Sequence, residues 1–400
     1  MAAPLPFHEY ANRRMRLAFM TLPRDIHLSG EGSAWFTPVD AVRKQRLEAG
    51  ERFVSLGHYD YLSLSRHPHV LSAAHAAIDA HGVGAGASRL IGGERVIHGA
   101  FEAELSTFLG SEAALVMGAG YLVGLSLIPH LVGAHDLILM DELVHSSMIH
   151  GAKATRATVR TFRHNDMDHL AQLLDEQRGS HGACLILVDS LYSMDGDLAD
   201  LPRLLELRDA FKAWLLVDEA HSIGVLGASG RGICEHYGID ASQVDILVGT
   251  LSKTFASMGG FICARRDVID WLKFTLPGFV FSVGLSPVIM ATAQAELDVL
   301  RREPDRVARL QALSRTFLTR AKAHGFCVGD AIGAGVIPIL FDTPHATIAA
   351  SRALAEAGIY APPIMHMGIG SGKPRIRFFL SADLDPGLVE DVFAILKPSL

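Results

Sequence analysis

The chain has 400 residues, of which 49% are hydrophobic and 20% charged, and its formal net charge is −7 at pH 7. This length allows a large core, and the composition is typical of a globular protein. The negative balance disfavours a nucleic-acid-binding protein, because such proteins carry a basic surface. The four cysteines form no C-x-x-C pair, so the sequence predicts a reducing compartment, no disulfide framework and no thiolate metal site.

Residues 1–55 are predicted to form an N-terminal arm. The first residues, MAAPLPFHEYANRRMRLAF, contain no unbroken apolar stretch of the kind found in a secretory signal. The longest uncharged stretch begins at Ala113 and is interrupted by four glycines and Pro129. A buried turn and helix is therefore expected there in place of a membrane span. These features predict a cytoplasmic protein without an integral membrane segment.

Residues 56–285 alternate between short apolar runs and amphipathic segments. The apolar runs lie at residues 114–117, 136–140, 184–190, 214–221 and 245–252. Helical patterns lie between them, for example at residues 168–177 and 201–212. Strands that are apolar on both faces and are separated by helices are typical of a parallel sheet covered on both sides. The sequence predicts an α/β catalytic domain here, with a mostly parallel central sheet.

The pattern changes in the last part of the chain. A long helical stretch at residues 291–325 is followed by apolar runs at 336–341 and 375–380. This order predicts a smaller α+β domain over residues 286–400. A cleft between two domains, outside the carboxyl ends of parallel strands, is a favoured place for a ligand.

Asp218, Glu219 and His221 follow one of the apolar runs, where polar groups are costly unless they serve a purpose. An ATPase could use such an acidic pair to hold Mg²⁺, but it needs a phosphate loop upstream. The nearest candidate, MGIGSGKP at residues 367–374, lies downstream and has Pro374 in place of the Mg²⁺-binding hydroxyl. The ATPase hypothesis is therefore disfavoured.

A pyridoxal-phosphate enzyme needs a lysine for the cofactor aldehyde, an anion beside the ring nitrogen, a phosphate cradle and a flat group against the ring. Lys253 is the candidate lysine, Asp218 the candidate anion and His145 the candidate flat group. The candidate phosphate cradle consists of Thr250, Ser252 and residues 117–122, which include Gly120, Tyr121 and Leu122. His221 could reach the ring hydroxyl from the same turn as Asp218. Each residue alone has an ordinary structural explanation, and it is their shared position at strand ends that favours a cofactor site.

The chain resembles the α-oxoamine synthases, a family of fold-type I pyridoxal-phosphate enzymes. The resemblance runs from about residue 50 to residue 382 and rests on GAGASRLIGGERVIHGAFEAELSTFLG, RHND, YSMDGDLADLP, VDEAHSIGVLGASGRG, GTLSKTFASMGGF, FSVGLSP and PRIRFFLSA. Within the family, GTLSKTFASMGGF is most similar to the serine palmitoyltransferase branch. The resemblance implies a fold-type I transferase that uses pyridoxal 5'-phosphate and no metal.

The family reaction implied is a decarboxylative Claisen condensation. An α-amino acid and an acyl-CoA would give an α-aminoketone, CoA and CO₂, in a homodimer with its active sites at the subunit interface. The residues leave three alternatives open. These are an aminotransferase or another lyase on the same fold, the disfavoured ATPase, and a cofactor-free acyl-CoA-binding protein.

The resemblance also implies a role for each site residue. Lys253 would bind the cofactor aldehyde and carry the Cα proton, and Asp218 would pair with the ring nitrogen. The remaining expectations are His221 and Ser193 near the ring oxygen, His145 against the ring, Gly120, Tyr121, Leu122, Thr250 and Ser252 around the phosphate, Ser282 at the phosphate of the neighbouring subunit, and Arg377 on the amino-acid carboxylate.

Some positions depart from the family pattern. Tyr59 stands where an asparagine that helps to bind the amino-acid carboxylate is usual, and it becomes a candidate substrate-binding residue. Gly284 replaces a second hydroxyl beside Ser282, and Asp383 replaces a histidine. The cofactor residues are retained, so the sequence predicts either a serine palmitoyltransferase-like enzyme or a specialised member that makes a secondary metabolite or a signal.

Overall fold

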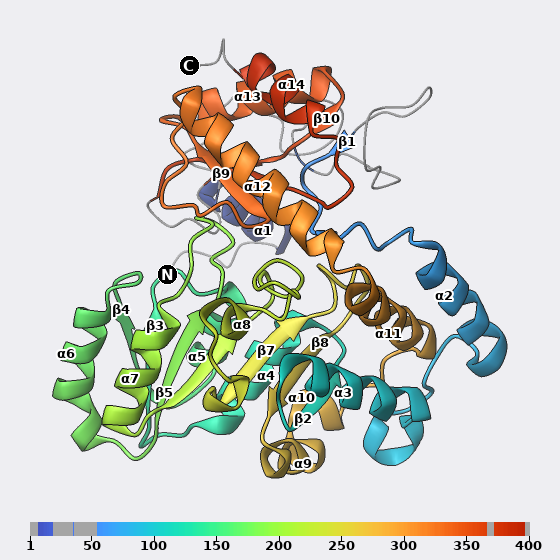
Figure 1. The fold of residues 1–400 in the computed structure, drawn as a ribbon. Coiled ribbons are helices and arrows are strands. Elements are labelled where there is room, and N and C mark those ends of the chain that lie inside the picture. The colour runs from blue at the N-terminus through green and yellow to red at the C-terminus, as the bar shows by residue number, and fades with distance from the viewer. Residues whose placement is uncertain (1–6, 19–34, 36–53, 366–371, 397–400) are drawn as a thin grey trace.

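The computed structural model describes residues 7–18, 35, 54–365 and 372–396 (Figure 1). Its largest element is a seven-stranded sheet with the order β2-β8-β7-β6-β5-β3-β4. The strands are β2 (Ala113–Met117), β3 (Leu137–Asp141), β4 (Thr158–Phe162), β5 (Cys184–Asp189), β6 (Trp214–Asp218), β7 (Ile246–Thr250) and β8 (Gly260–Ala264). Within this sheet β8 runs antiparallel to both of its neighbours and the other pairs are parallel. The predicted mostly parallel sheet is confirmed.

Helices cover both faces of this sheet (Figure 1). They are α3 (Val96–Leu109), α4 (Gly120–Leu131), α5 (Ser146–Lys153), α6 (Met167–Gln177), α7 (Leu201–Phe211), α8 (Ile233–Tyr237), α9 (Arg266–Thr275) and α10 (Pro277–Val280). Alternate residues of β5 belong to different cores, with Leu185 and Leu187 in one and Ile186 and Val188 in the other. Successive side chains of a strand point to opposite faces, so the sheet is buried on both sides.

Two strands of the large sheet were not foreseen. β4 lies at the sheet edge and has the partly exposed sequence TVRTF, which contains no continuous apolar run. β8 begins at Gly260, the second residue of a glycine pair that resembles a turn in the sequence. Both strands exist because neighbouring strands supply their hydrogen bonds, and this is a property that a local pattern does not carry.

The C-terminal part contains a three-stranded antiparallel sheet with the order β11-β12-β9. Its elements are β9 (Val336–Leu340), β11 (Pro363–Ile364), β12 (Arg375–Phe379), α12 (Asp305–Ala323), α13 (Pro344–Glu356) and α14 (Gly387–Leu396). A separate parallel pair joins β1 (Val54–Ser55) to β10 (Ile359–Tyr360). The division of the chain at residues 55 and 285 stays a prediction.

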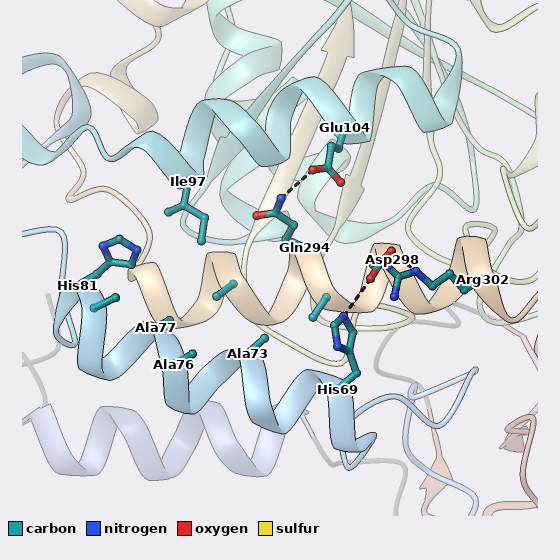
Figure 2. Close-up of a pocket in the computed structure, with 13 residues that line it drawn as sticks. His69, Ala73, Ala76, Ala77, His81, Ile97, Glu104, Gln294, Asp298 and Arg302 are labelled. Carbon is teal, nitrogen blue, oxygen red and sulfur yellow. Dashed lines mark hydrogen bonds and ion pairs between the residues drawn. The ribbon is translucent and has the colours of Figure 1, made fainter.

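The long helical stretch expected at residues 291–325 is two helices. α11 (Pro287–Arg302) ends before Pro304, and α12 begins at Asp305. Proline has no backbone N–H and disfavours helix in the residue before it, so the pattern breaks there. α11 packs against α3 and against α2 (Pro68–His81), and Figure 2 shows it between these two helices.

The remaining elements are α1 (Phe7–Ala18) and the short turns η1 (Arg89–Gly93), η2 (Arg178–Ser180) and η3 (Ala241–Gln243). Of the residues that the structure describes, no helix combines the length and apolar character needed to cross a membrane.

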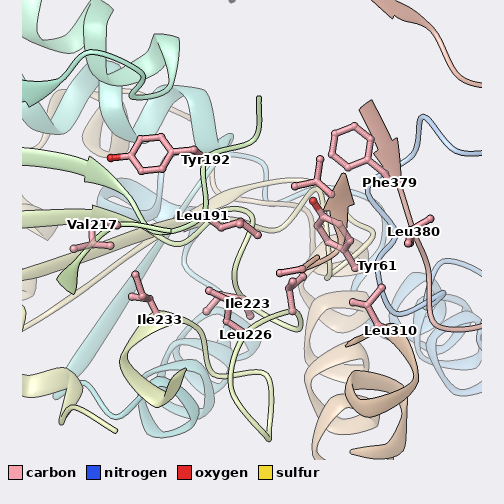
Figure 3. Close-up of a cluster of buried hydrophobic side chains, with 14 of the residues drawn as sticks. Tyr61, Leu191, Tyr192, Val217, Ile223, Leu226, Ile233, Leu310, Phe379 and Leu380 are labelled. Carbon is pink, nitrogen blue, oxygen red and sulfur yellow. The ribbon is translucent and has the colours of Figure 1, made fainter. Parts of the chain in front are cut away.

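Buried side chains join the large sheet to the C-terminal part. Tyr61, Leu191, Ile223, Leu310 and Phe379 belong to one apolar cluster and are each at most 4% exposed (Figure 3). Figure 3 shows Leu310 on its helix and Phe379 on its strand, both near Tyr61. This contact fixes the carboxyl ends of β5 and β6 relative to β12.

Candidate functional site

A cavity of about 280 Å³ lies at the carboxyl ends of β6 and β7. Seven of the residues predicted from the sequence line it, together with seven others. The predicted ones are Gly120, Tyr121, His145, Asp218, Thr250, Ser252 and Lys253. Because the strands are parallel, residues that follow them in the chain meet at one edge of the sheet.

Lys253 follows β7 and is half-buried in this cavity. Burial lowers the pKa of its amine to about 8, although the carboxylates of Asp218 and Asp189 oppose that shift. A lysine with a lowered pKa presents more neutral amine near neutral pH, and the neutral amine is the nucleophile that attacks an aldehyde.

Asp218 and Glu219 are neighbours in sequence but point to different surroundings. Asp218 lines the cavity, and its Oδ1 accepts a hydrogen bond of 2.9 Å from the Ala220 N–H. Glu219 is 1% exposed and accepts from the Ile233 N–H at 3.2 Å, beneath the turn. The acidic pair therefore does not act as a unit, which weakens further the case for an Mg²⁺-binding acidic box.

His221 is 7% exposed and is not among the residues that line the cavity. Its Nδ1 lies 2.7 Å from the Tyr61 hydroxyl. Burial holds the pKa of His221 well below its ordinary value, and the charge of Lys253 adds to this. The imidazole is neutral, so one ring nitrogen donates and the other accepts; with the phenol as donor to Nδ1, the ring proton resides on Nε2.

His145 caps the N-terminus of α5 and lines the cavity. Its Nδ1 lies 2.8 Å from Ser147 Oγ, and its backbone N–H donates to the buried carboxylate of Asp189 at 3.2 Å. Burial lowers the pKa of His145, so its ring is uncharged at neutral pH. A neutral imidazole held at both its ring and its backbone is suited to lie flat against another ring.

Small residues and hydroxyls form one end of the cavity. Thr250 Oγ1 lies 2.8 Å from Ser252 Oγ, and α4 begins at Gly120 beside them. A Cβ at Gly120 would come within 2.8 Å of Thr250 Cβ and Oγ1. Backbone N–H groups at a helix N-terminus together with hydroxyls form a ready anion site, and only glycine leaves this approach open.

Arg377 lies on β12, outside the set of residues that wall the cavity. Its Nη1 donates to the Ser193 carbonyl at 3.1 Å, and its guanidinium lies 5.0 Å from the Phe379 ring centroid. Burial lowers the pKa of Arg377, and the nearby phenol of Tyr59 opposes this shift. Its Nε is buried and has no hydrogen-bond partner among the described residues. A buried donor without a partner calls for an explanation, and a bound anion would supply one.

Tyr59 connects Arg377 to the cavity. The Lys253 Nζ lies 6.0 Å from the centroid of the Tyr59 ring, and that ring packs edge-on against Phe379 at 4.5 Å. The distance from the lysine to the arginine is thus spanned by one aromatic side chain.

Three predicted residues have other surroundings within this chain. Ser193 contributes its carbonyl to Arg377 and does not line the cavity. Leu122 packs against the core under α4. Ser282 is half-buried at the end of α10 and is likewise absent from the cavity wall. Their assigned roles stay predictions.

Other residues of the site were not singled out from the sequence. They are Tyr61, Asp189, Ser147 and Ala220. Asp189 was detectable in principle, because it ends a strand at the same edge as Asp218. Tyr61 had no such signal, because its contact with His221 spans 160 residues of sequence. No group of three or more metal-ligating side chains occurs in the described part of the chain, and MGIGSGKP falls mostly on residues outside it.

Comparisons with known proteins agree on one family. A family model described as aminotransferase class I and II matches residues 51–396. The 8-amino-7-oxononanoate synthase of Beijerinckia indica subsp. indica is 40% identical over 333 residues, which are 83% of this chain and 84% of the relative. That of Methylobacterium nodulans is 42% identical over 338 residues, 84% of each chain. The solved structure of Sphingomonas wittichii serine palmitoyltransferase superposes with a TM-score of 0.85 at 29% identity, covering 98% of this chain and 96% of the other.

Proposed function

The chain belongs to the class I and II aminotransferase family and, within it, to the α-oxoamine synthases, and on that premise we propose that it condenses an α-amino acid with an acyl-CoA. The products are an α-aminoketone, CoA and CO₂. The observation that carries the proposal is that Lys253 and Asp218, from the ends of neighbouring strands, line one cavity.

The cofactor of this family is pyridoxal phosphate, and the residues present fit it. The cavity has an amine of lowered pKa, a carboxylate, and an anion cradle that a side chain at Gly120 would fill. When bound, pyridoxal phosphate supplies an electron sink that stabilises negative charge on the amino-acid Cα. We assign its phosphate to Thr250, Ser252 and the N-terminus of α4, beside Tyr121.

Lys253 and Asp218 carry the two central roles. The amine of Lys253 would hold the cofactor through its aldehyde, and the same amine would take and return the proton at the substrate Cα. Asp218 would pair with the ring nitrogen and favour its protonated form, because an opposite charge nearby stabilises a cation. His221 would hydrogen-bond the ring oxygen, and His145 would lie against the ring.

Arg377 and Tyr59 form the proposed site for the amino-acid carboxylate. The unpaired Nε of Arg377 offers a donor, and its burial makes a charge-assisted bond there strong. Tyr59 stands where the family usually has asparagine, and its phenol lies beside the same guanidinium. The substrate carboxylate would thereby be held one aromatic ring away from Lys253.

A homodimer that shares its active sites is part of the proposal. Phe281 and Val283 flank Ser282 and are 86% and 62% exposed, and Ile91 and Val96 nearby are 82% and 92% exposed. The Ser88 and Val283 backbones pair, which brings η1 to this surface. Large apolar side chains exposed together mark an interaction surface, and the proposal assigns Ser282, which lies among them, to the phosphate of a partner subunit. Phe281→Glu should give a monomer by light scattering and a loss of activity.

A cytoplasmic location is also proposed. Cys184, Cys234 and Cys263 are buried and free, and Cys327 is exposed and free. Unpaired thiols are typical of a reducing compartment.

The decisive experiment is an absorbance titration of the cofactor-loaded protein with glycine, L-alanine and L-serine, followed by addition of an acyl-CoA. We expect a visible band that shifts with one amino acid, and CoA release only when both substrates are present. Transfer of the amino group to a keto acid without CoA release would instead identify an aminotransferase. Turnover of L-serine with palmitoyl-CoA would favour a serine palmitoyltransferase-like enzyme over a specialised member.

A further inference from the structure

His164 lies between two carboxylates outside the cavity. Its Nδ1 is 2.9 Å from Asp141 Oδ1, and its Nε2 is 2.8 Å from Asp197 Oδ2. The Asp141 side chain is fully buried, and that of His164 is 20% exposed. Carboxylates accept hydrogen bonds, so both ring nitrogens must carry protons and the side chain is an imidazolium.

The two carboxylates belong to different structural units. Asp141 is the last residue of β3 in the large sheet. Asp197 ends the loop of residues 192–197, in which the Gly196 N–H donates to the Tyr192 carbonyl at 2.8 Å. The His164 ring also packs edge-on against Tyr192, with ring centroids 4.4 Å apart. The imidazolium therefore ties both ends of this loop to the sheet.

The middle of the same loop holds the two arginines of β12. The Ser193 carbonyl accepts from Arg377 at 3.1 Å. The Asp195 carboxylate accepts from Arg375 at 2.7 Å, and this pair is largely buried. These hydrogen bonds join the loop, and through it the large sheet, to the two arginines of β12.

We propose that His164 is a positioning residue for the amino-acid substrate, because its imidazolium fixes the 192–197 loop that holds the guanidinium of Arg377. The inference rests on the proposed function of Arg377 and adds a residue that touches neither substrate nor cofactor. A neutral side chain at position 164 makes at most one of the two charge-assisted bonds. The loop then loosens, and Arg377 loses the carbonyl that orients its Nη1.

The test compares His164→Gln and Asp197→Asn with the wild-type dimer, and His135→Gln serves as the matched control. His135 is exposed in the turn that precedes β3, at the opposite end of the strand from Asp141. Hydrogen exchange of residues 190–198 reports the loop without any substrate. Calorimetry of glycine, L-alanine and L-serine with cofactor-loaded protein reports the carboxylate site, and separate titrations give the affinities for pyridoxal phosphate and acyl-CoA.

Both variants should speed exchange in residues 190–198 and weaken amino-acid binding by about tenfold, equivalent to about 1.4 kcal/mol. Their affinities for cofactor and acyl-CoA should match those of His135→Gln. Unchanged exchange and amino-acid binding would overturn the inference, as would an equal loss of all three affinities, which indicates a general structural role. If the wild-type protein itself binds none of these amino acids, the proposed function fails, and the substrate role of His164 is refuted with it.

Discussion

The Tyr61 hydroxyl and the Nδ1 of His221 lie 2.7 Å apart, although 160 residues separate them in sequence. Tyr61 is fully buried beside Phe379, and His221 ends the turn that carries Asp218. With the phenol as donor to Nδ1 the ring proton lies on Nε2, and with Nδ1 as donor to the phenol oxygen it does not, so this contact couples the tautomer of His221 to Tyr61. A residue far from the strand ends thus sets the hydrogen-bonding capacity of the site.

Tyr61→Phe should lower both stability and turnover. Removing one partner of a buried hydrogen bond costs about 1 kcal/mol, and the freed imidazole is no longer held in one tautomer. Urea unfolding and kcat with saturating substrates measure the two effects. Tyr237→Phe is the control, since it removes a 3.1 Å bond to the Ala199 carbonyl away from the cavity. A normal kcat in Tyr61→Phe would show that the tautomer does not matter.

Gly120→Ala should weaken cofactor binding. The new methyl group would lie within 2.8 Å of Thr250 Cβ and Oγ1, where the phosphate is proposed to bind, and overpacking of this kind costs roughly 1–3 kcal/mol. The dissociation constant of pyridoxal phosphate, from absorbance titration of cofactor-free protein, measures the change. Gly99→Ala on α3 is the control, because Gly99 is exposed and a Cβ there meets nothing within 4 Å. Equal affinities of the two variants would place the phosphate elsewhere.

Attachment of pyridoxal phosphate to the cofactor-free protein should depend on pH through Lys253. Burial lowers the pKa of this amine to about 8 from 10.5. The neutral amine is the reactive form, so the attachment rate should rise with pH and level off above about pH 8. Stopped-flow absorbance gives the profile, and borohydride reduction followed by mass spectrometry identifies the lysine. A midpoint near the ordinary lysine value, or labelling that survives Lys253→Ala, would contradict the assignment.

Arg377→Gln should weaken amino-acid binding by roughly 2–4 kcal/mol, because it removes one partner of a desolvated charge pair. The acyl-CoA affinity and the cofactor band should change little. Calorimetry with the amino acid that the wild-type protein prefers provides the measurement. Arg352→Gln is the control, since Arg352 is exposed on α13. A loss of acyl-CoA affinity in Arg377→Gln alone would assign this arginine to the other substrate.

Local sequence was sufficient for the proposed cofactor end of the site. Asp218 and the segment from Thr250 to Lys253 each follow an apolar run, and such runs predict strands. Parallel strands bring their carboxyl ends to one edge of the sheet, so these residues meet there irrespective of the conformation of the connecting loops. The family motifs carried the same information about Lys253 and His145.

The substrate end depended on tertiary structure. Arg377 meets the Ser193 carbonyl across 184 residues of sequence, and Tyr61 reaches His221 across 160. The edge strand β4 depended on its neighbour in the sheet. The break between α11 and α12 depended on a single residue, Pro304. Sequence periodicity records which face of an element is buried, and so it predicted the sheet and its polar edge. The family resemblance already assigned Tyr59 and Arg377 to the amino-acid substrate. Which loop lies against which strand is decided by packing between distant segments, and only the folded chain shows that the Ser193 carbonyl meets Arg377.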